Sequence, residues 1–261
     1  MSSIKISIIT IAYNSEKTLE QTIKSVVDQN YPDLEYIIID GGSKDRTLDI
    51  VNKYRDRISV VVSEPDKGIS DAFNKGIGKA SGDVIGIINS DDLLSEGALG
   101  FLAKEFESDI DVYRGNMLIW DDNENKYYSD EPTMNFPLYK SIKAVCHPST
   151  FITKRAYSEW GVYRTDMKYK MDADILYRFY KNGARFKYIN ETLSIFRLGG
   201  ATSDDWRKKI PELRQMIINN GGSSVLAEFM VIKESLYCIL KQAVFALIGS
   251  KSARVLRYLH F

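Results

Sequence analysis

Cysteine is scarce in this 261-residue chain, which contains only Cys146 and Cys238, far apart and outside any CxxC pair. The scarcity excludes a disulfide framework and a cysteine-based zinc site, and it is typical of a reducing compartment. Net charge is absent as well, because 35 lysines and arginines balance 35 aspartates and glutamates. Since a nucleic-acid partner usually requires a basic surface, the composition gives no reason to expect nucleic acid as a partner.

Long hydrophobic runs are also missing. No stretch of about 18 uncharged apolar residues occurs, so no segment is predicted to span a bilayer. Residues 1–5 carry no basic stretch followed by a long apolar one, so we expect no secretory signal. These observations predict a cytoplasmic protein, and a peripheral position on the inner face of the cell membrane stays open.

Two glycine-rich phosphate-binding motifs are absent from the chain. GxGxxG does not follow the first predicted strand, and GxxxxGK[ST] does not occur. Dinucleotide-dependent enzymes and P-loop NTPases are therefore disfavoured. If the protein binds a phosphate group, something other than such a loop has to neutralise its charge.

The first 92 residues predict an alternation of strands and helices. Strands are predicted from β-branched, apolar runs and helices from apolar residues at helical spacing. The predicted strands cover 4–11, 34–39, 58–62 and 84–88, and the predicted helices cover 16–29, 45–54 and 69–80. This alternation predicts an α/β fold with a right-handed, doubly wound and mostly parallel sheet flanked by helices.

The remaining residues predict further helices and shorter strands. The helices are expected over 95–107, 154–160, 172–181, 204–219 and 225–248, and the strands over 111–120, 126–129, 147–152, 188–189 and 193–196. Ser95 is the expected N-cap of the first of these helices. Between 130 and 145 the hydrophobic pattern weakens, which predicts an active-site loop, and a second loop over 197–203 contains two glycines suited to closing over a ligand.

Polar residues follow three of the predicted parallel strands. They are Tyr13-Asn14, Asp40-Gly41-Gly42 and Asn89–Asp92. Ligands of open α/β sheets bind at the carboxyl edge of the strands, where these residues should gather. Asp91 and Asp92 can converge on one Mg²⁺ or Mn²⁺, since these ions prefer oxygen ligands. The alternative is that the two acidic residues simply mark a turn.

Five stretches, taken in order, carry a resemblance to a known family. They are Ile9–Asn14, Asp40–Asp45, Glu64–Gly76, Asn89–Asp92, and Met171–Asp174 together with Arg178. In this combination the sequence resembles the family-2 glycosyltransferases, which have the nucleotide-diphospho-sugar transferase fold called GT-A. The stretch Glu64–Gly76 is similar to the bacterial surface-polysaccharide branch of colanic-acid and O-antigen type.

The resemblance implies a GT-A catalytic domain over residues 1–203, with a nucleotide-sugar half over about 1–120 and an acceptor half over about 121–203. A C-terminal helical extension covers 204–261. The implied activity is an inverting, metal-dependent transfer of a hexosyl or N-acetylhexosaminyl group from a nucleotide-diphospho-sugar, with a UDP-sugar favoured. The implied acceptor is a hydroxyl group of a glycan or of a polyprenyl-diphosphate-linked oligosaccharide, and the implied cofactor is Mn²⁺ or Mg²⁺.

The resemblance also implies roles for individual residues. Asp92 would be the principal metal ligand with Asp91 beside it, and Asp172 would be the catalytic base. The implied substrate contacts are Thr10, Ala12, Tyr13, Asp40, Asp66, Lys67, Asn89, Asp91 and His147. A carboxylate at Asp40 suits a uracil ring, because it can accept a hydrogen bond from the ring N–H.

Each of these roles has a structural alternative. Asp40 could close a turn with Gly41, Asp66 and Lys67 could form a solvated loop, and His147 could be an ordinary core or surface histidine instead of a contact to the diphosphate or acceptor. The carboxylates at 172 and 174 could serve a helix start, where the dipole favours them. Two departures from the family pattern affect finer contacts: Met171 replaces a common Glu, and Asn89 replaces a common Asp.

Other functions remain as alternatives. A sugar-nucleotide pyrophosphorylase would need a glycine-rich, basic loop after the first strand, which this chain lacks. A catalytically inactive sugar-nucleotide-binding protein would not need Asp91, Asp92 and Asp172 together.

The C-terminal region is apolar, but charges interrupt it. Residues 225–248 include Glu228, Lys233, Glu234 and Lys241, and a basic tail over 251–257 follows. The region predicts a peripheral membrane contact, a helix buried on the catalytic domain, or a dimer interface.

Overall fold

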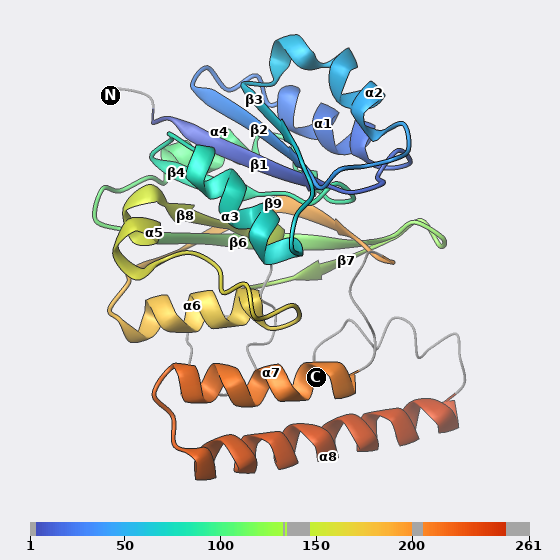
Figure 1. Ribbon diagram of the computed structural model, residues 1–261, viewed down its shortest axis with the longest axis vertical. Helices are drawn as coiled ribbons and strands as arrows, with labels where there is room; N and C mark the ends of the chain where they lie inside the picture. Colours follow the sequence, from blue (N-terminus) through green and yellow to red (C-terminus); the bar gives the residue numbers. More distant parts are fainter. Residues whose placement is uncertain (1–3, 133, 135–146, 200–205, 249–261) are drawn as a thin grey trace.

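The structure is a computed structural model that describes residues 4–132, 134, 147–199 and 206–248 (Figure 1). Most of the loop expected over 130–145 and most of the loop over 197–203 lie outside these residues, as do Cys146 and the basic tail beyond position 248. The described chain forms one mixed sheet with helices on both faces.

The sheet contains the strands expected from the sequence, two of them joined into one, and one unexpected strand, β5 (Leu93–Leu94). Their spatial order is β3 (Val60–Ser63), β2 (Leu34–Asp40), β1 (Ile6–Ala12), β4 (Val84–Ile87), β8 (Thr150–Thr153), β6 (Val112–Asp121), β9 (Phe186–Arg197) and β5 (Leu93–Leu94). A further strand, β7 (Lys126–Asp130), pairs with β6 as a hairpin.

The first four strands run parallel, as the alternation of strands and helices predicts. The next strand, β8, is antiparallel to both of its neighbours, so β6 and β9 point the same way as β1. The carboxyl ends of β1, β2, β3, β4, β6 and β9 therefore meet at one edge of the sheet, which we call the carboxyl edge.

One face of the sheet is covered by α1 (Leu19–Val27), α2 (Thr47–Lys53) and α4 (Ala98–Lys104). These helices bury apolar side chains at helical spacing against alternate residues of β1 and β2. A short 3₁₀ turn, η1 (Arg55–Arg57), connects α2 to β3.

The other face carries α3 (Ile69–Lys79), α5 (Lys154–Trp160) and α6 (Met171–Lys181). Close contact between α3 and β1 depends on Gly76, because a side chain there would collide with Ile9. Two C-terminal helices, α7 (Trp206–Asn219) and α8 (Ser224–Ile248), stack beyond α6 as an additional layer (Figure 1). Leu213, Met216 and Ala227 join the same apolar cluster as α6, so this extension shares the core of the sheet domain.

The region after Asp92 differs from the expectation. The predicted N-cap at Ser95 is wrong, since α4 begins at Ala98 after Gly97, which has a left-handed φ of 73°. Residues before it form β5 and pair with β9, and the Ser95 N–H donates to the Leu193 carbonyl at 3.0 Å. Pairing with a distant strand outweighs the local preference of serine for a helix start.

Two other expected strands are also revised. His147–Ser149 forms a 3₁₀ turn, η2, and the strand starts only at Thr150, since Pro148 has no N–H to donate to a ladder. The two short strands expected near the end of the domain are one strand, β9, with an irregular register opposite Gly115 and Asn116. This irregularity interrupts the local apolar pattern without ending the strand.

Among the described residues, no helix is long and apolar enough to cross a membrane. This includes α8, whose charged residues interrupt its apolar sequence.

Candidate active site

The polar residues after β1, β2 and β4 lie together on the carboxyl edge. Ala12 pairs with Asp40 in the register of β1 and β2, and the Gly41 N–H donates to the Ala12 carbonyl at 2.9 Å. Tyr13 projects from this edge with 62% of its surface exposed, so its ring is available to stack on a planar ligand.

Asp40 organises the turn at the end of β2. It is fully buried, and its carboxylate accepts hydrogen bonds from the Ser63 hydroxyl at 2.6 Å, the Ser43 hydroxyl, and the backbone N–H groups of Gly42 and Ser43. Turn formation thus takes up most of the acceptor capacity of this carboxylate. The contact with a uracil ring stays a prediction.

Two other predicted contacts lie inside the core. Thr10 is fully buried, and its hydroxyl lies 3.1 Å from that of Tyr36. Ala12 is 4% exposed. Their side chains help to fix β1, and this placement gives no support for a direct substrate contact by the Thr10 hydroxyl.

Asp66 and Lys67 follow β3 on the same edge. The Asp66 carboxylate lies against Gly41 and accepts from the Gly68 N–H at 2.9 Å, which orders the turn before α3. Lys67 is exposed, and its backbone N–H donates to Asp71 at 3.0 Å. The two residues are placed near the Asp40 turn, and their contact with a donor stays a prediction.

Asp91 and Asp92 follow β4 and form the most unusual electrostatic feature of the edge. Asp92 has no exposed surface. Burial, together with the Asp91 carboxylate, raises its pKa to about 8. Burial also raises the pKa of Asp91. Two adjacent carboxylates with raised pKa values are a favourable binding site for a divalent cation, because its positive charge would lower the pKa of both groups.

The remaining donors around this pair fit such an ion. Asn89 donates from its amide nitrogen to Asp92 at 3.2 Å, while its buried amide oxygen has no partner within the described residues. Those residues contain no cluster of three or more His, Cys, Asp and Glu side chains suited to a metal. A cation here would therefore take few ligands from the protein and the rest from substrate or water, as Mg²⁺ commonly does.

Arg197, at the end of β9, holds this loop in place and was not identified as a site residue from the sequence. Its backbone N–H donates to the Asp92 carboxylate at 3.2 Å, and its guanidinium donates to the Asp91 carbonyl at 3.2 Å. The guanidinium also lies 4.3 Å from the centroid of the Trp120 ring. The sequence shows only a basic residue at the end of a predicted strand. That this residue lies beside the two carboxylates depends on pairing between distant strands.

Asp172 lies in the first turn of α6, with His147 beside it. The Nδ1 atom of His147 and the Oδ1 atom of Asp172 are 3.2 Å apart. The imidazole stacks on Phe73 at a centroid distance of 5.0 Å and an interplanar angle of 11°. Burial lowers the pKa of His147, but Asp172 and then Asp92 more than offset it, so the pKa is raised.

Glu212 of α7 supports the loop that leads into α6. Its carboxylate accepts hydrogen bonds from the backbone N–H groups of Lys168 at 2.9 Å, Tyr169 at 2.6 Å and Lys170 at 2.8 Å. This role could not be predicted from the sequence, because the contact joins residues more than 40 positions apart. Arg178, which belongs to the stretches that carry the resemblance, donates from its guanidinium to the Val162 carbonyl at 2.6 Å and therefore has a structural contact.

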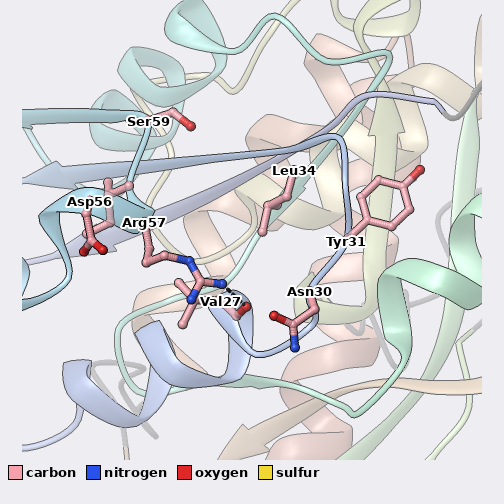
Figure 2. A pocket seen from close by; sticks show the side chains of 8 residues that line it. Val27, Asn30, Tyr31, Leu34, Asp56, Arg57 and Ser59 are labelled. Atoms are coloured by element: carbon pink, nitrogen blue, oxygen red, sulfur yellow. Dashed lines mark hydrogen bonds between the residues drawn. The ribbon is translucent and has the colours of Figure 1, made fainter.

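A cavity of about 270 Å³ lies away from these residues of the carboxyl edge (Figure 2). It is lined by residues at the end of α1, the start of β2 and the turn before β3, including Asn30, Leu34 and Arg57. Arg57 donates across it to the Val27 carbonyl at 2.9 Å. Because it lies at the amino ends of β2 and β3, this cavity is separate from the carboxyl edge and its carboxylates.

Comparison with known proteins supplies an independent view of this arrangement. A model of the family described as "Glycosyl transferase family 2" matches residues 7–193. Chondroitin synthase of Escherichia coli is 31% identical over 195 residues, which cover 71% of this chain and 28% of that protein. The chain thus spans a little more than a quarter of this relative.

Two solved structures share the fold. TarS of S. aureus, residues 1–349 in complex with UDP-GlcNAc, matches with a TM-score of 0.64 and 17% identity over 87% of this chain and 70% of that chain. The mannosyltransferase PcManGT from Pyrobaculum calidifontis, in complex with GDP-Man and Mn²⁺, matches with a TM-score of 0.64 and 16% identity over 98% and 79%. The expected GT-A architecture is confirmed by these similarities.

Proposed function

The chain belongs to glycosyl transferase family 2, and we propose that it transfers a sugar, with inversion, from a nucleotide-diphosphate donor to a hydroxyl group of a glycan or lipid-linked oligosaccharide. The observation that carries the proposal is the convergence of the Asp91–Asp92 pair and the His147–Asp172 pair. β8 is antiparallel to β4, with Phe151 opposite Gly86, so η2 at the start of β8 lies beside the end of β4. The two pairs are therefore neighbours on the carboxyl edge.

The donor site is assigned to the ends of β1, β2 and β4. Tyr13 is exposed for stacking on a base, and the Asp40 turn lies next to it. We propose a UDP-sugar that carries a hexosyl or N-acetylhexosaminyl group, in keeping with the UDP-GlcNAc in the complex of the structural relative TarS. Asp92 and Asp91 would hold Mn²⁺ or Mg²⁺, which would supply positive charge for the departing diphosphate.

The acceptor chemistry is assigned to Asp172. Its carboxylate takes the proton of the acceptor hydroxyl while that oxygen forms a bond to the anomeric carbon. The bond from the anomeric carbon to the diphosphate breaks at the same time, and its electron pair leaves with the nucleoside diphosphate. Attack from the face opposite the leaving group inverts the configuration. His147 orients the carboxylate through the 3.2 Å contact and is itself held by Phe73.

The cellular setting is part of the same proposal. Chondroitin synthase builds a polysaccharide, as its name states, and we propose that this protein acts in bacterial polysaccharide biosynthesis on the cytoplasmic side of the cell membrane. Residues 1–203 would carry the chemistry, and the extension over 204–261 would support it through the contact of Glu212 with the loop before Asp172.

The test is transfer by an Asp172→Asn variant. Asn keeps the size of the side chain but cannot take up the proton at neutral pH, so transfer should fall by about a thousandfold or more. Binding of UDP and of the sugar nucleotide, measured by calorimetry, should change little. Asp166→Asn, an exposed carboxylate before the same helix, is the control and should retain activity. Wild-type transfer by Asp172→Asn would remove Asp172 from this role.

Product analysis distinguishes this activity from its alternatives. A transferase releases a nucleoside diphosphate and slowly hydrolyses the donor when no acceptor is present. A pyrophosphorylase would form the sugar nucleotide from a nucleoside triphosphate and release pyrophosphate, and an inactive binding protein would do neither. A thermal-shift series of nucleotide sugars with Mn²⁺ identifies the donor, because a specific ligand stabilises the folded state.

A further inference from the structure

The helix α8 carries an apolar stripe on its outward face. The stripe consists of Val225, Phe229, Ile232, Leu236, Ile239 and Leu240. Val225 is 81% exposed and Leu240 is 65% exposed, so these side chains are not covered by the rest of the described chain. Figure 1 shows α8 as the outermost layer, with α7 between it and the sheet domain. The stripe is therefore open to a partner.

The spacing within this stripe is that of a helix–helix seam. From Val225 to Ile239 the positions alternate by four and three residues, which is the heptad pattern of a coiled coil. Ala243 continues the pattern and is also exposed. At 1.5 Å per residue the pattern from Val225 to Ala243 is about 27 Å long, enough for several interlocking layers of side chains.

The sheltered side of α8 has the opposite character. Ala227 and Met230 join the core, but farther along the helix the less exposed positions include Glu234, Ser235 and Cys238. A helix in contact only with its own domain and water should place apolar residues inward and polar residues outward. The reversed arrangement here indicates that the outward stripe has a partner of its own.

The charges at the rim of the stripe favour a second copy of the same chain. Glu228 lies on one side, fixed there by Arg214 at 2.5 Å, and Lys233 lies on the other. With Phe229 and Leu236 at a positions of the heptad, Glu228 is at g and Lys233 at e. In a parallel coiled coil a g residue faces the e residue five positions later on the partner helix, which places Glu228 opposite Lys233. An antiparallel pair centred on the stripe would instead bring the two Lys233 side chains together.

We propose that α8 forms the interface of a parallel homodimer, with the stripe of one chain packed against the same stripe of a second copy. Because one acidic and one basic residue flank the stripe, the described helix has no excess of positive charge to attract anionic lipid headgroups. This favours a second copy over a membrane as the occupant. The proposal concerns association and does not depend on which sugar the protein transfers.

The association test uses the full chain in sedimentation velocity over a range of concentrations. The wild type should sediment as a dimer, and Ile232→Glu and Leu236→Glu should each raise the dimer dissociation constant at least about a hundredfold. Both positions are exposed, so the melting temperature of the monomer and its binding of UDP should be retained. Val162→Glu, at an exposed apolar position away from α8, is the control and should leave the dimer intact.

The orientation test uses charge reversal and crosslinking. Glu228→Lys and Lys233→Glu should each weaken the dimer about tenfold, and the double variant should recover most of the loss. In a background without other cysteines, Val225→Cys should form a disulfide between chains only in a parallel pair. A dimer that crosslinks between positions 225 and 243 instead would overturn the parallel arrangement.

Two further outcomes would overturn the dimer itself. One is a wild type that remains monomeric at every concentration. The other is a monomer that floats with vesicles of anionic phospholipid through the stripe, with flotation lost in Leu236→Glu, which would assign the stripe to a membrane surface.

Discussion

His147 Nδ1 lies 3.2 Å from Asp172 Oδ1, and the Phe73 ring stacks on the face of the imidazole. A carboxylate at the start of a helix would otherwise be free to rotate. The histidine ties it to the carboxyl edge, where Asp92, in its ionised form, also acts on the imidazole.

His147 should therefore affect the chemical step more than donor binding. In His147→Gln we expect kcat to fall about tenfold to a hundredfold, because the orientation of Asp172 is relaxed, while the dissociation constant of UDP stays within about twofold. Steady-state kinetics together with calorimetry measure the two effects. A loss of UDP binding with unchanged kcat would place His147 in the donor site instead.

The same residue has a consequence for stability against pH. Because the pKa of His147 is raised above its ordinary value of 6.5, its protonated form stabilises the folded state below that pH. This contribution is lost as the pH rises through the raised pKa. The melting temperature of the wild type should thus fall relative to that of His147→Gln as the pH increases from 6 to 9. A constant difference over this range would contradict the prediction.

Asp92 should destabilise the protein when no cation is bound. Its pKa is about 8 in the folded chain, against an ordinary value of 3.8, so its ionisation opposes folding increasingly from pH 4 to pH 8. We expect Asp92→Asn to melt several degrees above the wild type at pH 8 without metal, and to lose this advantage near pH 4. Differential scanning calorimetry measures both.

Metal addition provides the matching experiment on this site. Mn²⁺ should raise the melting temperature of the wild type and leave that of Asp92→Asn almost unchanged, because the variant lacks the proposed principal ligand. Asp91→Asn should retain part of the response. Equal stabilisation of all three proteins by Mn²⁺ would mean that the ion binds elsewhere.

Glu212 should be required for a stable entry into α6. Its carboxylate accepts from three consecutive backbone N–H groups, and Glu212→Gln replaces one of the two accepting oxygens with a donor. We expect a loss of about 1–3 kcal/mol in the free energy of unfolding, measured by urea denaturation. Because Asp172 follows this loop, kcat should fall as well. Glu159→Gln, an exposed residue of α5, is the control.

Two glycines of α3 offer a matched pair for packing. Gly76→Ala places a methyl group against Ile9, so we expect it to destabilise the fold by about 1–3 kcal/mol. In Gly78→Ala, on an exposed turn of the same helix, the added methyl group has no other atom within 4 Å. Because alanine favours a helix more than glycine does, this variant should be stabilised by about 0.5–1 kcal/mol. Urea denaturation of both variants compares them directly, and equal effects would contradict the proposed contact.

Much of the fold could be predicted from local patterns. The strands and helices of the first 92 residues follow from apolar periodicity, and the parallel arrangement follows from their alternation. The segment after Asp92 could not be predicted in this way, because Leu93 pairs with Ile195, about 100 residues later, and this pairing displaces the helix start from Ser95. Local preference and distant pairing compete there, and the distant pairing determines the structure.

In the candidate site, too, some residues could be predicted from local sequence and others depend on distant contacts. Asp91 and Asp92 were predicted from their place after a strand, and Asp172 from the resemblance to the family; their roles stay predictions. Arg197 and Glu212 were missed because their roles lie in contacts with partners 105 and more than 40 residues away. Residues proposed to carry chemistry can thus be predicted from the sequence, whereas residues that position them depend on contacts made in the completed fold.

The contact between position 197 and Asp92 starts from a main-chain amide. Every amino acid except proline supplies that amide, so the chain can exchange the side chain at this position over evolutionary time without losing this support of the carboxylate. The contacts of the guanidinium with Trp120 and Asp122 would be lost in such an exchange. Among related proteins, the backbone position of β9 beside this carboxylate should therefore vary less than the identity of the residue at position 197.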